Sequence, residues 1–106
     1  MSTASHQLHD EIAATLERWR ADEARVRQHL AAPGISHPEQ VMEKTGLQMF
    51  EAIASGELPS VPIGAALDFF PIEFEPGRMV FQGHPSARFC NPMGTIHGGW
   101  IATLLD

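Results

Sequence analysis

The chain has one cysteine, few basic residues and no long apolar run, and each of these shortages excludes a class of protein. Cys90 alone cannot form an intrachain disulfide, which agrees with a reducing compartment. No apolar stretch approaches the roughly 18 residues that a membrane span requires. Residues 1–6 lack the basic segment and apolar core of a signal peptide. We therefore expect a cytoplasmic protein without a membrane partner.

The balance of charge is acidic. The 106 residues include 7 Lys and Arg against 13 Asp and Glu, which gives a net charge of −6. Because the basic residues are scattered and form no stripe, we expect no nucleic-acid partner. An anionic ligand would need a local cluster of cations, for which Arg78 and Arg88 are the nearest candidates. The alternative interpretation is that both are solvated charges at strand ends.

The histidines show no metal-site spacing. There are six of them, and His6 and His9 stand near the N-terminus without a Cys pair or acidic partner at zinc-site spacing. The chain also lacks a glycine-rich phosphate loop of the nucleotide-binding kind. We expect no bound metal.

Apolar residues recur at helical spacing through the first third of the chain. They run from Leu8 to Leu30 with one polar break at Glu23. The opposite face carries charges of both signs, which suits a solvated surface. The Ala-Pro-Gly sequence at 32–34 should end this helix.

A second helix is predicted after this break. Ser36 and Glu39 match a capping box, in which the hydroxyl and the carboxylate accept hydrogen bonds from free amides at a helix start. The helix should run to about Ser55, with Gly56 as a left-handed stop. Residues 1–59 are therefore predicted to be an N-terminal helical extension of two helices.

The pattern changes to extended character near Ser60, so residues 60–106 are predicted to form a second domain. Residues 67–75 alternate in character, with Pro71 indicating an edge strand or a bulge. Pro76 and Gly77 fit the centre of a type II turn, and residues 78–84 return as a second strand. The apolar residues expected on one face of the first strand are Phe70, Ile72 and Phe74.

The last sixteen residues predict a loop that feeds a buried helix. Asn91 and Pro92 form a turn, and a helix should begin at about His97. Its first free amides, including those of Gly98 and Gly99, would stabilise an oxyanion together with the helix dipole. The alternative is that the two glycines only allow close packing of the helix on a sheet.

Asp106 lies eight residues after Gly98. On one helix this spacing is about 12 Å, so no single carbonyl could touch both residues and two chains would have to share a site. Alternatively, Asp106 is only a carboxylate on a helix face. Cys90 and His97 could be read as nucleophile and base, but their spacing does not bring them together, and Cys90 is more simply a small buried hydrophobe.

The segment 59–106 resembles the hotdog-fold acyl-CoA thioesterases, in particular the phenylacetic-acid-degradation (PaaI-like) branch. Asn91, the His97-Gly98-Gly99 sequence and Asp106 occur in the order and spacing of that family. The resemblance implies an α+β hotdog fold, in which a long antiparallel sheet wraps a central helix. The later strands, and a Ser or Thr that assists the Asp in many members, have no counterpart here. The expectation is therefore a C-terminally truncated domain that is inactive by itself.

The resemblance also implies roles for these residues. Gly98 would polarise the thioester oxygen, and Asp106 of the opposing subunit would act as general base or nucleophile. Asn91 would orient the water or the carbonyl, and His97 would shape the loop. The remaining candidates, expected to bind substrate, are Gly99 and Arg88.

The family needs no metal or prosthetic group, and coenzyme A enters as part of the acyl-CoA or aryl-CoA substrate. The complete protein is expected to be a homodimer or homotetramer. One alternative is a hotdog hydratase or dehydratase with a His-Asp type site that acts on acyl thioesters. Another is a non-catalytic interaction module that docks a partner through its N-terminal helices.

Overall fold

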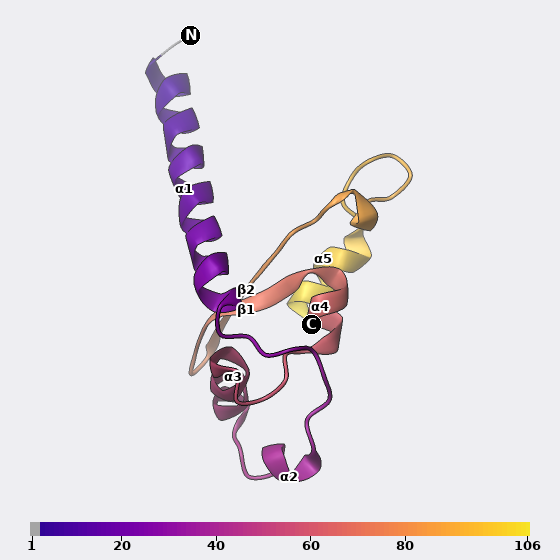
Figure 1. Cartoon of the computed structure of the whole chain (residues 1–106). Helices are drawn as coiled ribbons and strands as arrows, with labels where there is room; N and C mark the ends of the chain where they lie inside the picture. The colour runs from indigo at the N-terminus through magenta and orange to yellow at the C-terminus, as the bar shows by residue number, and fades with distance from the viewer. Residues whose placement is uncertain (1–2) are drawn as a thin grey trace.

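The computed structural model describes residues 3–106, so Met1 and Ser2 of the predicted helical extension lie outside the described residues. The chain is a mixture of helices and one antiparallel hairpin, which confirms the α+β class (Figure 1). In chain order the elements are α1 (Thr3–Arg27), α2 (Pro38–Val41), α3 (Gly46–Ser55), α4 (Pro62–Leu67), β1 (Phe69–Glu75), β2 (Arg78–Gly83), the 3₁₀-helix η1 (Ala87–Phe89) and α5 (Gly98–Leu105).

The long helix α1 confirms the helical period of the first third of the chain. It ends at Arg27, before the Ala-Pro-Gly sequence at 32–34 that was predicted to end it. Its N-terminal half extends away from the rest of the molecule, which makes the chain elongated, at 59 × 31 × 25 Å (Figure 1). Within residues 3–106, neither α1 nor any other helix is long and apolar enough to cross a membrane.

The single second helix predicted from Ser36 to about Ser55 is wrong, because two helices occupy this stretch. Thr45 begins α3 with a reciprocal cap: its hydroxyl accepts from the Gln48 amide at 3.1 Å, and the Gln48 side chain accepts from the Thr45 amide at 2.9 Å. This cap favours a fresh helix start at Gly46 over continuation of α2. The part before residue 60 thus holds three helices, α1, α2 and α3.

The caps of these short helices also differ in detail from the prediction. The residue that precedes α2 is His37, and its amide donates to the side chain of Gln40 at 2.8 Å, so Ser36 and Glu39 are not the capping pair. At the end of α3, Gly56 has φ +84°, which confirms the predicted left-handed stop.

The helix α4 was not expected, since the stretch after residue 59 was predicted to be extended. Pro62 occupies its first turn, where a missing amide proton costs nothing. The helix ends at Asp68, whose φ of +58° places it in the left-handed region. This turn delays the start of β1 to Phe69.

The hairpin of β1 and β2 confirms the predicted strand pair. Glu75 pairs with Arg78 across the turn, and Gly77 has the positive φ, +76°, that a type II turn requires at this position. The register shifts between Pro71 and Glu73, which is the irregularity that the proline indicated.

This bulge changes which apolar side chains share a face. Phe70 and Ile72 pack with Val26 of α1, whereas the ring of Phe74 lies 6.2 Å from that of Phe50 in α3. The single face predicted for Phe70, Ile72 and Phe74 is therefore wrong, because one extra residue reverses the alternation of a strand. The bulge lets a two-stranded sheet contact helices from both of its faces.

Two small clusters form the core. The first joins α1 to β1, and the second joins α3 to Leu58. Leu30 packs against both clusters. The helices before residue 60 and the hairpin after it therefore share a core. The buried members of the clusters are Val26, Phe70 and Ile72 in the first, and Ala52, Ile53 and Leu58 in the second.

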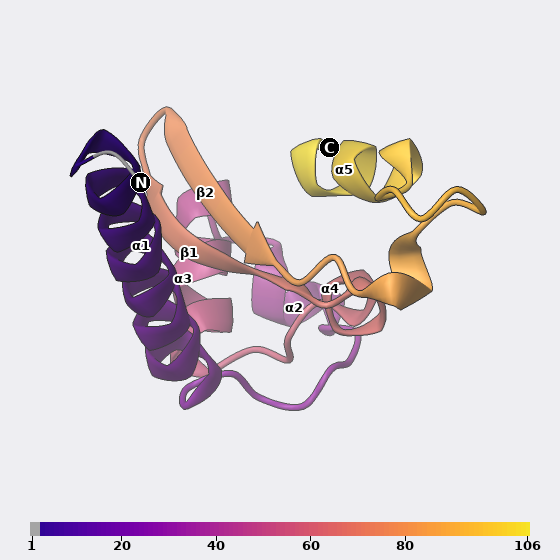
Figure 2. The same ribbon diagram turned by 90° about the horizontal axis from the view of Figure 1, so that it is seen from above.

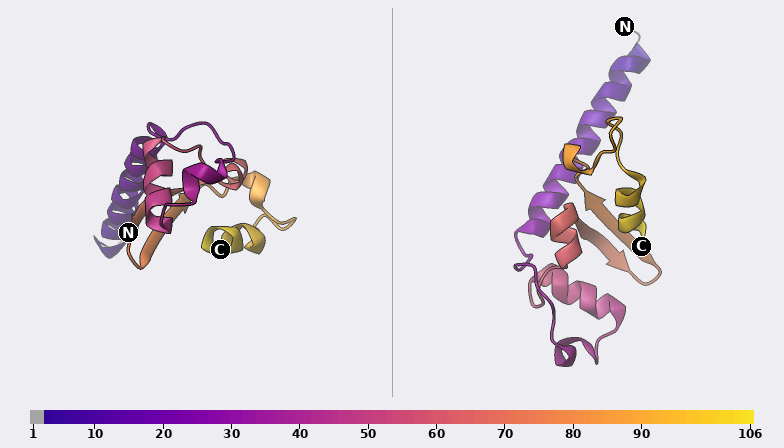
Figure 3. Two further views of the ribbon diagram at one scale, coloured as in Figure 1. Left: turned by 90° about the horizontal axis from the view of Figure 1, so that it is seen from below. Right: turned by 90° about the vertical axis from the view of Figure 1, so that its right-hand side faces the viewer.

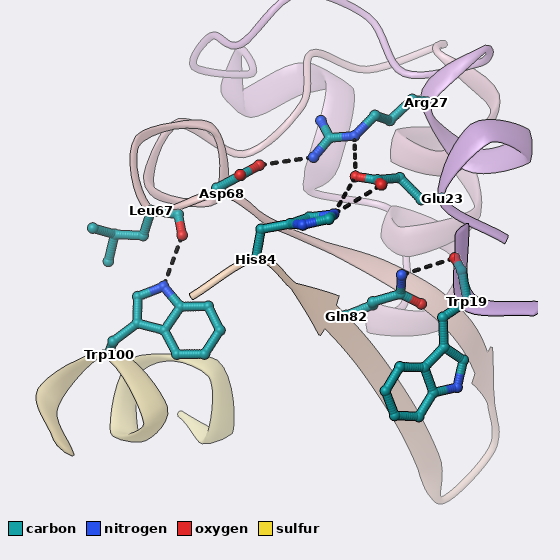
Figure 4. Close-up of polar contacts among 8 residues, drawn as sticks. All are labelled: Trp19, Glu23, Arg27, Leu67, Asp68, Gln82, His84 and Trp100. Carbon is teal, nitrogen blue, oxygen red and sulfur yellow. Dashed lines mark hydrogen bonds and ion pairs between the residues drawn. The ribbon is translucent and has the colours of Figure 1, made fainter. Parts of the chain in front are cut away.

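A polar network fastens α1 to the hairpin (Figure 4). The Glu23 carboxylate accepts from Arg27 at 2.9 Å and lies 2.7 Å from Nε2 of His84, at the end of β2. Arg27 also donates to Asp68 at 2.8 Å, and its guanidinium lies 4.6 Å from the centre of the Phe70 ring. Burial alone would raise the pKa of Glu23, but the hydrogen bonds from Arg27 and His84 outweigh it and hold that pKa below 4.5.

The lowered pKa of Glu23 makes the attachment of α1 pH-dependent. Since the unfolded carboxyl titrates near 4.5, the network stabilises the fold fully above that pH and is lost as the pH falls through the lower folded pKa. We expect Glu23→Gln to reduce the free energy of unfolding at pH 7 by about 1 kcal/mol, because both side-chain partners are substantially exposed. Urea unfolding at pH 7 and pH 3 measures this.

The difference between the two proteins should shrink at pH 3, because below the ordinary pKa of a glutamate carboxyl the stabilisation from its lowered folded pKa is progressively lost. Glu17→Gln is the matched control, because Glu17 is exposed and forms no ion pair with any residue in the described part of the chain. An equal loss of stability in both variants, or a difference that persists at pH 3, would contradict this account of the network.

Candidate functional site

The segment between β2 and α5 forms a closed loop that sets the start of α5. After η1, Cys90 pairs with Ile96 in an isolated antiparallel bridge. The amide of His97 then donates to the carbonyl of Phe89 at 2.8 Å. The chain therefore comes back to Phe89 immediately before α5 begins.

Asn91 organises the tip of this loop. Its side-chain oxygen accepts from the amides of Met93 at 2.9 Å and Thr95 at 3.3 Å, and its side-chain nitrogen lies 2.5 Å from the Thr95 hydroxyl. Gly94 turns the chain with φ +83°. Both polar atoms of the Asn91 side chain are thus engaged inside the loop.

The first turn of α5 has one occupied amide and one free amide. His97 is the N-cap, and its Nδ1 accepts from the Gly99 amide at 2.9 Å. An accepting Nδ1 places the proton of a neutral imidazole on Nε2. The amide of Gly98 donates to no atom of residues 3–106. The sequence counted the amides of both glycines among the free donors and gave the oxyanion role to Gly98; the structure leaves Gly98 as the unpaired donor.

The surroundings of the two glycines differ as well. A Cβ at Gly98 would meet nothing within 4 Å, but one at Gly99 would lie 3.0 Å from Nδ1 of His97. Both glycines are exposed in the single chain. Gly98 therefore lies at an exposed position with free space beside its Cα atom.

Trp100 fixes α5 to the rest of the molecule (Figure 4). Its indole Nε1 donates to the carbonyl of Leu67 at 2.8 Å, and its ring stacks on Phe89 with the centroids 6.1 Å apart. A Cβ at Gly83 would lie 2.8 Å from the indole, so only glycine fits there. Sequence reasoning missed this contact, although a glycine that ends a strand indicates the close approach of another group.

Asp106 lies at the opposite end of α5 from Gly98. The helix confirms the predicted start near His97, and the Asp106 amide closes its last turn by donating to Ala102 at 3.0 Å. Eight residues at 1.5 Å each separate Gly98 and Asp106 by about 12 Å.

α5 and α1 lie on opposite sides of the hairpin (Figure 2 and Figure 3).

An open, mainly apolar cavity of about 1010 Å³ lies beside the second half of α5. Asp106 lines it, whereas Gly98 does not. Representative apolar residues that line it come from the hairpin, from α3, α4 and α5, and from the segment after α1: Leu30, Phe50, Ile63, Phe69, Phe81 and Leu104. The carboxylate therefore stands at the edge of a space suited to an apolar group.

The two candidate cations differ in their surroundings. Arg78 lies 2.6 Å from Glu73 and 3.8 Å from Glu75, and the hydrogen bond and charge of Glu73 raise its pKa. Arg88 lies over the ring of Phe89, 5.2 Å from its centre, and has no carboxylate partner among residues 3–106. Arg88 is thus the better placed of the two to meet a phosphate.

Cys90 and His97 have different hydrogen-bond partners and do not form a nucleophile-base pair. The Cys90 thiol lies 3.8 Å from the carbonyl of Ser86, and Nδ1 of His97 is taken by Gly99. The described residues contain no group of three or more His, Cys, Asp or Glu side chains placed to hold a metal.

Comparison with protein-family models, with curated proteins and with solved structures finds no match to this chain. The function is therefore argued from its own residues and their geometry.

The indole of Trp100 gives a direct test of how α5 is held. Trp100→Phe keeps an aromatic ring against Phe89 but removes the donor to Leu67. We expect it to lower the free energy of unfolding by about 1 kcal/mol, because a net hydrogen bond contributes about that much. Trp19→Phe is the control, because the hydrogen bond at Trp19 uses its main-chain carbonyl, which the substitution keeps. Equal urea midpoints for the two variants would contradict the role of the indole.

Proposed function

We propose that the chain contributes the catalytic helix of a hotdog-type acyl-CoA or aryl-CoA thioesterase similar to the PaaI-like branch. The observation that carries the proposal is the first turn of α5, where the Gly98 amide is unpaired while the Gly99 amide is satisfied by His97. An unpaired amide at a helix start, aided by the helix dipole, is a donor suited to the oxygen of a thioester as it gains negative charge.

The reaction is hydrolysis, and its base is the Asp106 carboxylate. In the proposed mechanism, Asp106 removes a proton from water as the water attacks the thioester carbon and Gly98 stabilises the oxyanion; the C–S bond then breaks, and the coenzyme A thiolate leaves and takes up the proton from Asp106. Attack by the carboxylate itself, followed by hydrolysis of the resulting anhydride, is the other route. The about 12 Å between the two residues requires that they come from different subunits. Each active site would therefore combine Gly98 of one copy with Asp106 of another.

We infer the positions of the parts of the substrate from the surroundings of α5. The apolar cavity edged by Asp106 would take the acyl or aryl group, and Arg88 would meet a phosphate of coenzyme A. Gly99 would support the site through its hydrogen bond to His97, and Asn91 through the shape of the loop. A hotdog domain wraps its helix with more strands than β1 and β2, so we assign the activity to a polypeptide that continues this sheet.

Gly98 allows a sharp test, because it is the first residue of α5. Gly98→Pro removes the proposed donor, yet proline is favoured at this position and His97 already has the extended backbone, φ −64° and ψ 131°, that a following proline requires. Gly98→Ala keeps the amide and adds a Cβ that meets nothing within 4 Å. We expect Gly98→Pro to lower kcat about 100-fold or more and Gly98→Ala to retain most activity.

The measurement is hydrolysis of an aryl-CoA, followed by release of the free thiol, in a polypeptide that extends residues 1–106 through the rest of the sheet. Circular dichroism checks that both variants keep the fold. Similar rates for Gly98→Pro and Gly98→Ala would rule out the amide as the oxyanion donor.

Sharing of the site between subunits predicts complementation. Asp106→Asn and Gly98→Pro should each be nearly inactive alone, because each lacks one half of every site. Mixed dimers of the two contain one site with both defects and one site with neither, so we expect about half of the wild-type activity per dimer after unfolding and refolding them together. No recovery in the mixture would place both residues in one subunit's site or outside the chemistry.

A further inference from the structure

The N-terminal half of α1 carries an apolar stripe that no part of the described chain covers. Leu8 is 57% exposed, Ile12 49%, Leu16 38% and Trp19 52%. Their spacing of four, four and three residues places all of them on one face of the helix. Four large apolar side chains on one face of a surface helix indicate an interaction site rather than scattered exposure.

This stripe continues the face by which α1 is already attached to the molecule. Further along the same face, Glu23 contacts His84 and Val26 packs on β1. The hairpin is too short to cover the preceding turns, which extend beyond it (Figure 1). The uncovered stripe thus has the same orientation as a packed surface but lacks a partner.

The charges beside the stripe indicate what the partner is. Residues 3–17 of α1 contain Asp10, Glu11 and Glu17 but no Lys or Arg, whereas residues 18–27 contain four Arg against two acids. At about 100° per residue, Glu11 and Arg18 lie on the same side of the stripe. Neither forms an ion pair within residues 3–106; Arg18 donates only to the Thr15 hydroxyl, at 3.1 Å. A surface that is acidic at one end and basic at the other is complementary to itself when reversed.

We propose that α1 binds α1 of a second copy of this chain, in antiparallel orientation around a two-fold axis. Leu8 then faces Trp19 of the other copy, and Ile12 faces its Leu16. Glu11 pairs with Arg18 of the other copy, and this ion pair occurs twice because the interface is isologous. The midpoints of these pairs all fall between residues 13 and 15 of the sequence, so one axis satisfies the apolar layers and the ion pairs together.

The charges also select the orientation. In a parallel pair the two-fold axis would run along the helices and place Glu11 and Arg18 of the two copies on opposite edges of the seam, so the two ion pairs would not form. The apolar layers alone would fit either orientation. With only four layers the contact is at the small end of specific interfaces, about 1,200 Å² in total, so we expect a reversible dimer in the micromolar range.

Charge exchange on the full chain tests the proposal by sedimentation equilibrium. Glu11→Arg and Arg18→Glu each turn attractive pairs into repulsive ones, and each should weaken dimerisation about tenfold. The double variant Glu11→Arg with Arg18→Glu should restore the wild-type constant, because the pairs are exchanged and the net charge is unchanged. Glu17→Arg, on the opposite face, is the control with the charge change of Glu11→Arg and should leave dimerisation unchanged.

A separate variant tests the apolar stripe. Ile12→Glu should abolish dimerisation, with circular dichroism as the check that α1 stays helical. A wild-type chain that is monomeric at about 1 mM would overturn the proposal. So would a double charge variant that associates as weakly as the single ones.

Pairing through α5, which the proposed thioesterase mechanism requires, is separable from pairing through α1. A dimer that survives Ile12→Glu and is lost in Ile101→Glu, at the exposed face of α5, would assign the association to α5 and overturn pairing through α1. Loss with Ile12→Glu alone supports pairing through α1 whether or not the chain has thioesterase activity.

Discussion

The position of α5 depends on one side chain, the indole of Trp100. It is the residue of α5 that joins a hydrogen bond to Leu67 with a ring stack on Phe89. Ile101 and Leu105 of the same helix are exposed, at 46% and 83%, and contribute little to holding it. Since the free amide of Gly98 lies only two residues before Trp100, the direction of that amide is set largely by how the indole is seated against Gly83.

The helix α1 is likewise held by few contacts. A helix of 25 residues is attached to a two-stranded hairpin mainly by Val26 and by the carboxylate of Glu23, which is shared between Arg27 and His84. A hairpin by itself is marginally stable in water, so helices on both of its faces are needed to stabilise it. The bulge beside Ile72 makes this possible, because it sends Phe70 toward α1 and Phe74 toward α3.

The sequence predicted those features that depend on local pattern. Helical spacing identified α1, and Pro76-Gly77 identified the hairpin, because each follows from the conformation of a few neighbouring residues. The break before α3 was also local, since Thr45 and Gln48 form a capping box, but apolar residues on both sides obscured it. The helix α4 was missed because two prolines near residue 60 indicated extended chain, whereas Pro62 in fact begins a helix.

The candidate site was predictable in its residues but not in their hydrogen bonds. Gly98, Gly99 and Asp106 lie at the two ends of one helix, as their spacing indicated. No pattern could show that His97 takes the amide of Gly99, because that depends on the rotamer of one imidazole. The inward turn of Asn91 depends likewise on its contacts with Thr95. These contacts reduce two apparent amide donors to one and assign the asparagine to the loop.

The two proposed pairings of this chain are compatible because they use different surfaces. α1 and α5 lie on opposite sides of the hairpin, so a copy bound at one does not block the other (Figure 2 and Figure 3). Each pairing is isologous, and two different two-fold axes on one protomer generate a closed tetramer when they meet at a right angle. An oblique angle would instead generate larger assemblies. The contacts of Glu23 with Arg27 and His84 contribute to that angle, because they help to orient α1 relative to the hairpin that α5 rests on.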